Sequence, residues 1–373
     1  MENMIPVTRP LLPPLEEFLP YLQQIWESKR LSNNGPFHEE LERALARFLG
    51  VEYLSLFNNG TTALITALKA LGIQDEIITT PYTFVATPHS LVWNRLTPVF
   101  VDIDPDSFNI NPARIEAAIT SKTTAIMPVH CYGRPCDVDA IQAIADRHGL
   151  KVLYDAAHAF GVRDQGGSIL RHGDLSVLSL HATKVFNTFE GGAIISRTAQ
   201  MKRHIDQVRN FGFIDEVTVD TVGINGKMSE INAAFGLVQL QHVERALSNR
   251  REIDSEYRRL LEGIPGIGCV PEASDYSANY AYFPIMVNER YPLSRDALYE
   301  ALKAEGIFAR RYFYPLVTEL PVYKDAVCTF PTPVASRTAA QVICLPIYPD
   351  LQQVDIQRVV RVVRAHASQC TSA

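Results

Sequence analysis

Three short segments of the sequence carry side chains that could act together in one chemical site. Lys184 follows an apolar run and precedes Gly191-Gly192, Asp155 ends the strand-like residues 151–155, and Gly60 opens a Gly-Thr-Thr helix start. A lysine amine can form a Schiff base with an aldehyde, and a carboxylate can hold a ring nitrogen protonated. Backbone N–H groups at a helix start can bind a phosphate. These are the parts that a pyridoxal phosphate enzyme requires.

Each of these residues could instead have a purely structural role, and this alternative stays open. Most lysines lie on the surface, and Gly60-Thr61-Thr62 could be a plain helix start, since Asn and Thr are common caps. The apolar neighbours of Lys184 favour a partly buried amine, whose pKa falls below the usual value of about 10.4. Asp155 ends an apolar strand, where a buried carboxylate needs either a bound cation or structural hydrogen bonds.

Alternating helices and strands precede Lys184 and would position these side chains. The pattern predicts helices over residues 36–49, 60–71, 83–94, 112–119 and 137–148, and strands over residues 53–57, 76–79, 98–101, 124–129 and 151–154. Such alternation with apolar strands predicts an α/β fold, a mostly parallel sheet covered on both faces. Ligands bind beyond the carboxyl ends of such strands. We therefore expect one crevice to collect Asn59, Tyr82, His130 and Asp155.

The rest of the chain divides into an arm and a second unit. Residues 1–35 are rich in proline and aromatic residues and are predicted to form an arm with one amphipathic stretch. After Gly192 the pattern predicts helices over residues 200–211 and 228–261, then a strand over 281–287 and a helix over 294–305. We predict that residues 1–245 form the arm and a large cofactor-binding domain, and that residues 246–373 form a small C-terminal α/β domain.

Composition excludes several classes of protein. The chain has 373 residues, 47% of them apolar, with a net charge of −6, which gives no electrostatic footprint for nucleic acid or a membrane surface. Its six cysteines form no CxxC pair, and no secretory signal or membrane-length apolar run occurs, so we expect a soluble, cytoplasmic, reduced protein. No HExxH motif, paired-cysteine ladder or P-loop occurs, so no metal site and no nucleotide hydrolysis are expected.

Five stretches, in order, resemble the DegT/DnrJ/EryC1/StrS family, and the resemblance covers about residues 5–350. They are residues 59–64 (NGTTAL), 81–87 (PYTFVAT), 155–158 (DAAH), 179–184 (SLHATK) and 223–228 (GINGKM). Any one stretch is weak, whereas the ordered set is specific. The family consists largely of sugar aminotransferases with the aspartate aminotransferase type of fold, fold type I of the pyridoxal phosphate enzymes. The resemblance therefore implies this fold, this cofactor and an aminotransferase.

The resemblance also implies a role for each matching residue. Lys184 would be the catalytic Schiff-base lysine, and Asp155 would pair with the ring nitrogen. The other residues implied in cofactor binding are Gly60, Thr61, Thr62 and Ser179 at the phosphate, Phe84 and His158 at the ring, and Asn225 from a neighbouring subunit. Many members have Gln in place of His158 and Arg in place of Lys227. A core role remains the alternative for Phe84 and His158.

Substrate residues follow less directly from the resemblance. His181 lies in the lysine motif and would be structural or touch the substrate. Arg310, Tyr312 and Tyr314 lie in a C-terminal segment where the family binds the nucleotide-sugar. The asparagine shared between subunits implies a homodimer with shared active sites.

Residues 181–192 resemble the branch of the family that aminates C4 of dTDP-4-keto-6-deoxy-D-glucose. L-glutamate is the expected donor, and dTDP-4-amino-4,6-dideoxy-D-glucose, a sugar used in O-antigen and antibiotic glycosylation, is the expected product. The alternatives are a C3-aminating enzyme, a sugar dehydratase and a non-catalytic regulatory protein. Lys184 argues against the dehydratase, which has histidine there, and the intact cofactor residues argue against the regulator. A dinucleotide oxidoreductase lacks its GxGxxG motif.

Overall fold

The larger part of the protein is built on an eight-stranded sheet. The structure, a computed structural model, describes residues 4–272, 274–323 and 328–367. The strand order is β14-β4-β3-β5-β6-β9-β10-β2. The strands are β2 Tyr53–Phe57, β3 Glu76–Thr79, β4 Thr97–Phe100, β5 Thr123–Ile126, β6 Lys151–Asp155, β9 Leu175–Ser179, β10 Gly192–Ser196 and β14 Cys328–Thr329. Among these described strands, β10 runs antiparallel to both of its neighbours, β9 and β2, and the other neighbouring strands pair in parallel.

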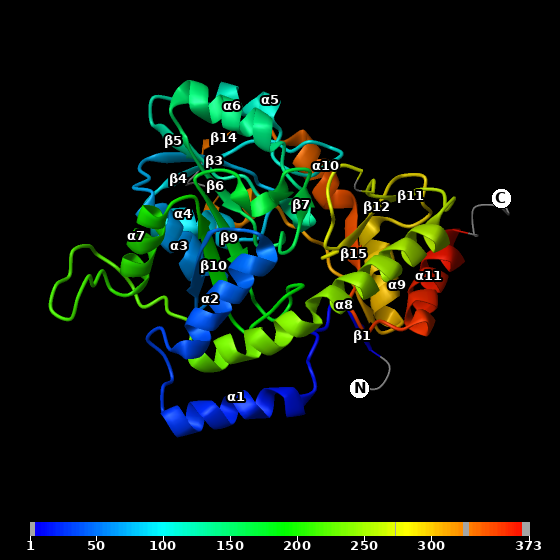
Figure 1. Cartoon of the computed structure of the whole chain (residues 1–373). Coiled ribbons are helices and arrows are strands. Elements are labelled where there is room, and N and C mark those ends of the chain that lie inside the picture. The colour runs from blue at the N-terminus through cyan, green and yellow to red at the C-terminus, as the bar shows by residue number, and fades with distance from the viewer. Residues whose placement is uncertain (1–3, 273, 324–327, 368–373) are drawn as a thin grey trace.

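Helices cover both faces of this sheet (Figure 1). Ile77 packs into the core beneath α3, whereas the next residue, Ile78, packs into the core beneath α6, as expected for strands buried on both faces. The helices of this part are α1 Leu15–Ser28, α2 Pro36–Leu49, α3 Gly60–Ala70, α4 Ala86–Trp93, α5 Pro112–Ile115, α6 Val138–His148 and α7 Ala199–Arg209. The arrangement confirms the predicted mostly parallel α/β sheet.

The C-terminal part is built on a three-stranded antiparallel sheet in the order β11-β12-β15. Its elements are β11 Ile267–Cys269, β12 Phe283–Val287, α9 Arg295–Ala304, α10 Pro333–Gln341, β15 Val342–Leu345 and α11 Gln353–Ala367. Two short strands, β1 Ile5–Pro6 and β13 Ile307–Phe308, pair in parallel, and β7 Arg163–Asp164 pairs with β8 Gly167–Ser168. The 3-10 turns are Glu116–Ala118, Cys131–Gly133, Ile169–Arg171, Val317–Glu319 and Pro321–Tyr323.

One long helix, α8 Glu230–Leu261, links the two parts. Phe235, near its start, belongs to the core beside α2, and Tyr257, near its end, belongs to the C-terminal core. The predicted division at residue 245 falls inside this helix. The division into two domains therefore stays a prediction, although each half of α8 serves a different core.

Most predicted elements before Lys184 have the predicted type, whereas several elements after it, such as β10, α10 and α11, are not predicted. No strand is predicted between Lys184 and residue 200, yet Gly192–Ser196 forms β10, the second strand from one edge of the sheet. A short apolar run cannot be assigned from periodicity alone, and this one is fixed by pairing on both sides. The helix predicted from residue 83 begins only at Ala86, because Thr83 and Phe84 lie in the preceding loop.

A buried charge network anchors α2 to β2 and α7. Glu42 accepts the N–H of Leu56 at 2.9 Å and lies 2.8 Å from Arg209 Nη1 and 3.0 Å from Lys202 Nζ. Burial alone would raise the pKa of Glu42, but the hydrogen bond with His38 and the charges of Arg209 and Lys202 outweigh it and hold that pKa well below its ordinary range. The carboxylate is therefore ionised in the folded protein.

We expect Glu42→Ala to lower the free energy of unfolding by about 2–3 kcal/mol at pH 7, because the buried Arg209 and the N–H of Leu56 lose a charged acceptor, although Arg209 keeps its pair with Asp206 at 2.8 Å. Glu39→Ala on the same helix is the matched control, since Glu39 forms only an exposed pair at 3.7 Å with Arg43 and should cost at most about 1 kcal/mol. Urea unfolding measures both. The contribution of Glu42 is full above the unfolded pKa of 4.5 and is lost as the pH falls. Equal losses in both variants would contradict the prediction.

Candidate active site

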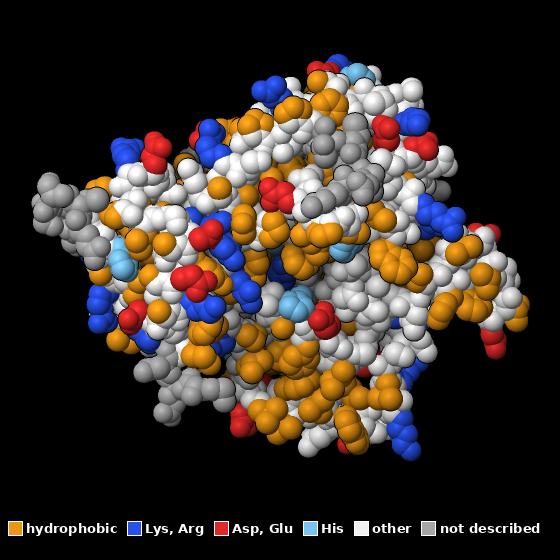
Figure 2. Space-filling model, turned by 180° about the vertical axis from the view of Figure 1, so that it is seen from behind, with side chains coloured by type: hydrophobic (Ala, Val, Ile, Leu, Met, Phe, Trp, Pro, Cys, Tyr) orange, Lys and Arg blue, Asp and Glu red, His pale blue; other side chains and the backbone are white. Residues whose placement is uncertain are grey.

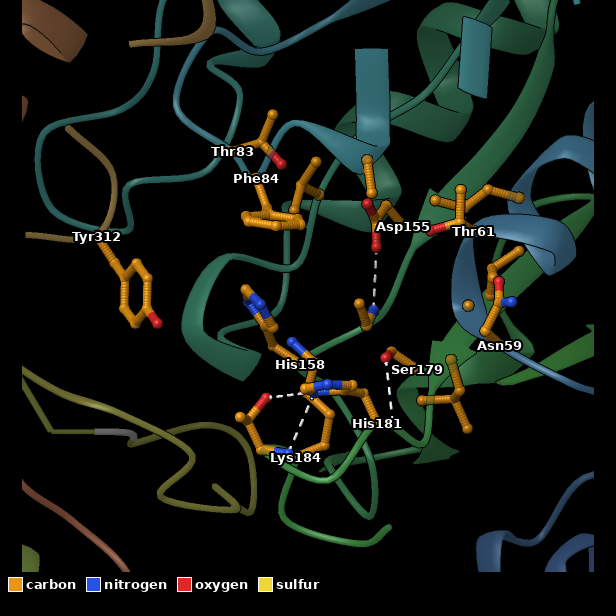
Figure 3. Close-up of a pocket in the computed structure, with 18 of the residues that line it drawn as sticks. Asn59, Thr61, Thr83, Phe84, Asp155, His158, Ser179, His181, Lys184 and Tyr312 are labelled. Atoms are coloured by element: carbon orange, nitrogen blue, oxygen red, sulfur yellow. Dashed lines mark hydrogen bonds between the residues drawn. The ribbon is translucent and has the colours of Figure 1, made fainter. Parts of the chain in front are cut away.

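A cavity of about 600 Å³ lies where the strands of the large sheet end. Asn59, Asp155 and Ser179, at or just after the ends of β2, β6 and β9, line it, and Tyr282 and Tyr312 reach it from the C-terminal part. In Figure 3, Asn59, Thr61 and Ser179 lie on one side, Tyr312 lies on the opposite side, and Lys184 and His158 lie between them. The crevice predicted beyond the strand ends is thus present.

The structure brings most of the predicted site residues to this cavity. Those that line it are Gly60, Thr61, Thr62, Phe84, Asp155, His158, Ser179, His181, Lys184 and Tyr312. Asn225, Arg310 and Tyr314 do not line it. The cavity therefore joins these predicted residues from five separate segments of the chain, and the chemical role of each residue stays a proposal.

Lys184 lies in the turn between β9 and β10. Its N–H donates to the carbonyl oxygen of His181 at 2.9 Å, and the next two residues, Val185 and Phe186, are buried and fix the turn. Burial lowers the pKa of the Lys184 amine to about 8, although the negative charge of Asp155 acts in the opposite direction. Roughly a tenth of the amine is therefore unprotonated and nucleophilic at pH 7, far more than for an ordinary lysine.

This pKa makes a testable prediction about aldehyde capture. The rate at which cofactor-free protein takes up pyridoxal phosphate should rise with pH through a midpoint near 8, because only the unprotonated Lys184 amine attacks an aldehyde. Stopped-flow absorbance across pH measures this rate. Since the charge of Asp155 raises the pKa of Lys184, Asp155→Asn should move the midpoint to lower pH. A midpoint near the ordinary lysine value of about 10.4 would contradict the prediction.

Asp155 presents a buried carboxylate to the same cavity. Its Oδ1 accepts the N–H of Ala157 at 3.1 Å, and its Oδ2 accepts the hydroxyl of Thr87 at 2.7 Å. Burial raises the pKa of Asp155, whereas the hydrogen bonds of Thr87 and Ala157 and the charge of Lys184 lower it. A cationic ligand group beside Asp155 would relieve the cost of burying this charge.

The start of α3 provides donors for an anion. Asn59 caps the helix and accepts the N–H of Thr62 at 2.8 Å, whereas the N–H groups of Gly60 and Thr61 have no acceptor within the described residues. A Cβ atom at Gly60 would lie 3.1 Å from Cβ of Ser179, so glycine lets the helix start approach that side chain closely. The Thr62 hydroxyl donates to the Asn59 carbonyl at 3.0 Å. Two N–H groups and the hydroxyls of Thr61 and Ser179 are thus the available donors.

For Phe84 and His158, packing in the core is the alternative to the predicted role at the cofactor ring. Phe84 is 56% exposed and lines the cavity, so it is not a core residue. His158 is buried and also lines the cavity, and its Nδ1 accepts the N–H of Tyr132 at 3.3 Å. Burial, followed by the charge of Lys184, lowers its pKa well below the ordinary histidine value. The ring is therefore neutral, with its proton on Nε2.

His181 sits at the mouth of the cavity. Its Nδ1 accepts the N–H of Thr183 at 3.2 Å, and its Nε2 lies 3.5 Å from Oε1 of Glu190. Both Glu190 and His181 line the cavity from the two sides of the lysine turn. This pair of polar side chains is available to a ligand at the entrance of the cavity.

Two residues expected in the crevice lie in the core. Tyr82 is fully buried, with its hydroxyl 2.6 Å from that of Tyr132. His130 is also fully buried, stacks on Tyr154 with ring centroids 4.6 Å apart, and accepts the N–H of Cys136 at 3.0 Å. The prediction that the crevice collects Tyr82 and His130 was wrong, because a position just after a strand does not fix the direction of a side chain.

The three remaining predicted residues lie away from the cavity of their own chain. Arg310 is exposed and pairs with Cys344 through its backbone, and the ring of Tyr314 lies 4.3 Å from the guanidinium of Arg295. Asn225 is exposed in the loop before α8, where it forms a β-bridge with Asn210. Lys227, where the family usually has Arg, donates to Oδ1 of Asn210 at 2.8 Å.

Asn59 lines the cavity as expected, whereas the lining residues Thr83, Glu190, Tyr282 and Phe313 were not predicted. Thr83 and Glu190 lie within or beside the motifs, so their proximity in sequence was an available signal. Tyr282 and Phe313 come from the C-terminal part, and no local pattern distinguishes them from other aromatic residues.

The residues present fit pyridoxal phosphate. The cavity offers a nucleophilic amine at Lys184, a helix start at Gly60 with N–H groups free for an anion, a buried carboxylate at Asp155 that forms no ion pair with a described residue, and an exposed aromatic ring at Phe84. No group of three His, Cys, Asp or Glu side chains able to hold a metal ion occurs in the described part of the chain. No helix among the described residues is long and apolar enough to cross a membrane.

Comparisons with known proteins agree with this chemistry. The model of the DegT/DnrJ/EryC1/StrS aminotransferase family matches residues 15–364. A Shigella dysenteriae protein named dTDP-4-amino-4,6-dideoxy-D-glucose transaminase is 56% identical over 366 residues, covering 98% of this chain and 99% of its own. An Escherichia coli protein of the same name is 54% identical, covering 97% of this chain and 98% of its own.

Solved structures share the fold. DesI, crystallised in the presence of its TDP-sugar product, superposes with a TM-score of 0.95 at 36% identity, over 99% of this chain and 94% of its own. Helicobacter pylori PseC, an aminotransferase involved in the biosynthesis of pseudoaminic acid, superposes with a TM-score of 0.92 at 28% identity, over 98% of this chain and 100% of its own.

Proposed function

This chain belongs to the DegT/DnrJ/EryC1/StrS aminotransferase family, and from that premise we propose that it aminates C4 of dTDP-4-keto-6-deoxy-D-glucose with L-glutamate as donor. The product is dTDP-4-amino-4,6-dideoxy-D-glucose. The predicted fold type, reaction class and cofactor are confirmed by the family match and the structural neighbours. The observation that carries the choice of substrate is the 56% identity to the Shigella dysenteriae transaminase over 98% of this chain.

Six residues of the cavity have a task in this proposed reaction. When bound, pyridoxal phosphate supplies an aldehyde that exchanges amines and a ring that withdraws electrons. Lys184 Nζ accepts the proton from the α-carbon of the donor and later returns a proton to C4 of the sugar. With the cofactor bound, Asp155 would hold the proton on the ring nitrogen and Phe84 would pack on the ring. The N–H groups of Gly60 and Thr61, with the hydroxyl of Ser179, would bind the phosphate.

Product analysis tests the substrate assignment. The purified protein is incubated with L-glutamate and, in separate reactions, with dTDP-4-keto-6-deoxy-D-glucose or its 3-keto isomer, and NMR identifies the aminated carbon. We expect 2-oxoglutarate and an amine at C4. An amine at C3 supports the alternative branch, and holoprotein that aminates neither sugar overturns the proposed function. Lys184→Ala protein serves as the background control.

A homodimer with shared active sites is the second part of the proposal. The loop between α7 and α8 projects from the body of the chain (Figure 1) and carries exposed apolar residues. These are Phe211, Phe213, Ile214, Val217, Val219 and Val222, of which Val217 is 87% exposed. Figure 2 shows a second apolar area at the lower edge of the opposite face, over α1, whose exposed residues include Leu15, Leu19 and Trp26. Surfaces of this kind support contact with a second copy.

Asn225 gives this proposal a sharp test, because it lies on the projecting loop and outside the cavity of its own chain. Lys184→Ala and Asn225→Ala subunits are coexpressed with different tags, and mixed dimers are isolated. If a site uses Lys184 of one subunit and Asn225 of the other, a mixed dimer contains one intact site and regains activity. Mixed dimers no more active than Asn225→Ala alone, or a monomeric mass in sedimentation, would contradict it.

A cytoplasmic location and a role in O-antigen biosynthesis complete the proposal. Cys131, Cys136, Cys269 and Cys344 form no disulfide bonds, and Cys370 lies outside the described residues. Free thiols and a nucleotide-sugar substrate support a reducing compartment. Fractionation of cells with an antibody to the native protein tests the location.

A further inference from the structure

Asp155 is held by a hydroxyl that does not itself reach the cavity. Thr87 lies in the first turn of α4, is fully buried, and donates to Asp155 Oδ2 at 2.7 Å. Its own oxygen lies 2.8 Å from the hydroxyl of Thr83, which is also buried and does line the cavity. Neither threonine is among the residues predicted for the site.

The direction of these bonds follows from the donors available. An ionised carboxylate only accepts hydrogen bonds, so the Thr87 proton points to Asp155. The Thr87 oxygen must then accept the proton of Thr83, because each hydroxyl has a single proton. The chain of bonds therefore runs from Thr83 to Thr87 to Asp155, and each bond polarises the next in the same sense. Both carboxylate oxygens keep further lone pairs for a group in the cavity.

We propose that Thr87, supported by Thr83, is a positioning residue that keeps the shared proton on the ring nitrogen of the cofactor and off Asp155. This inference rests on the proposed role of Asp155. A proton shared between a ring nitrogen and a buried carboxylate can reside on either group. When it resides on the nitrogen, both groups are charged, and this ionic arrangement is costly where water is excluded. Hydrogen bonds donated to the carboxylate stabilise that ionic arrangement. The cofactor ring then stays protonated and withdraws electrons from the substrate.

For this inference to hold, replacing either threonine must change the protonation of the cofactor ring more than it changes the stability of the fold. A hydrogen bond to a charged group shifts the balance between two protonation states by roughly ten- to a hundredfold. Thr66 offers a matched control, because it is also a buried helical threonine but its hydroxyl has no partner among the described residues. Thr87→Ser retains the hydroxyl and removes only a methyl group.

The test loads holoprotein with pyridoxal phosphate labelled with ¹⁵N in the ring and reads ring protonation from the ¹⁵N chemical shift. Thr87→Val should shift the signal toward the unprotonated ring and lower kcat about tenfold or more, with little change in KM for glutamate. Thr83→Val should move the signal in the same direction by less. Thr87→Ser and Thr66→Val should give the wild-type signal.

Each outcome decides a separate point. An unchanged ¹⁵N signal in folded Thr87→Val protein overturns the inference, as does an equal shift in Thr66→Val. If Thr87→Val does not fold, Thr83→Val decides, and an unchanged signal there overturns the inference. Wild-type protein that binds no labelled cofactor would instead overturn the proposed function, so the two failures are distinguishable.

Discussion

Replacing Lys184 by alanine should abolish transamination while leaving the fold intact. Lys184 is the only lysine among the described residues that line the cavity, so no second amine can replace it. Proton transfer by a positioned side chain contributes roughly 10²–10⁴-fold to a rate, and the variant loses the covalent anchor as well. Turnover should therefore fall by at least that factor in an assay of 2-oxoglutarate formation.

The fold should not suffer, because burial lowers the pKa of the Lys184 amine to about 8 and so penalises its charged form at pH 7. We expect the cofactor-free variant to have a Tm equal to or above that of cofactor-free wild type. Lys122→Ala, at an exposed lysine, is the control and should keep full activity. Borohydride treatment of wild-type holoprotein should tag the peptide that contains Lys184. A tag on another lysine would disprove this assignment.

Asp155→Asn should lower kcat on the order of 10²–10³-fold, the usual cost of removing one preorganised electrostatic group from a site. The amide has nearly the same shape as the carboxylate but carries no charge to hold a proton on a ring nitrogen. It also places a donor where Thr87 or Ala157 already donates, so one hydrogen bond is lost. Steady-state kinetics at saturating glutamate measures the effect, and cofactor retention on dialysis should fall with it.

Asp102→Asn separates this chemistry from the general cost of altering a buried aspartate. Asp102 is buried as well, accepts the N–H groups of Val334 and Ala335 at 3.0 and 2.9 Å, and does not line the cavity. The control should lower the Tm and leave kcat close to the wild-type value. If Asp155→Asn kept wild-type kcat, or if both variants lost activity alike, the role assigned to Asp155 would be wrong.

The sequence predicted the parts of the site that lie in local motifs. Lys184, Asp155 and Gly60 each occur where a strand gives way to a turn, and the parallel sheet brings those ends to one edge. Element type was predictable for the same reason. The helix over residues 36–49 has Pro36 at its start and Gly50 in the left-handed region at its end, and both signals are local.

The rest depends on contacts that no local pattern encodes. Strand β10 exists because β9 and β2 pair with it from either side. Tyr82 and Thr83 are neighbours in sequence, yet one is buried in the core and the other lines the cavity. Tyr282 and Phe313 reach the site only through the packing of the C-terminal part. Side-chain direction and long-range contact therefore set the limit of prediction for this chain.

The lysine turn leaves the sheet at Ser179 and re-enters it at Gly192, and these two residues face each other across one ladder. Gly192 also abuts the cap of α3, where a Cβ atom would lie 2.6 Å from the carbonyl oxygen of Asn59. One strand pairing therefore fixes both ends of the turn that carries Lys184 and holds the start of α3 against it. Tyr282 and Phe313 come from the C-terminal part, so substitutions there would reshape the cavity without moving Lys184 relative to the start of α3.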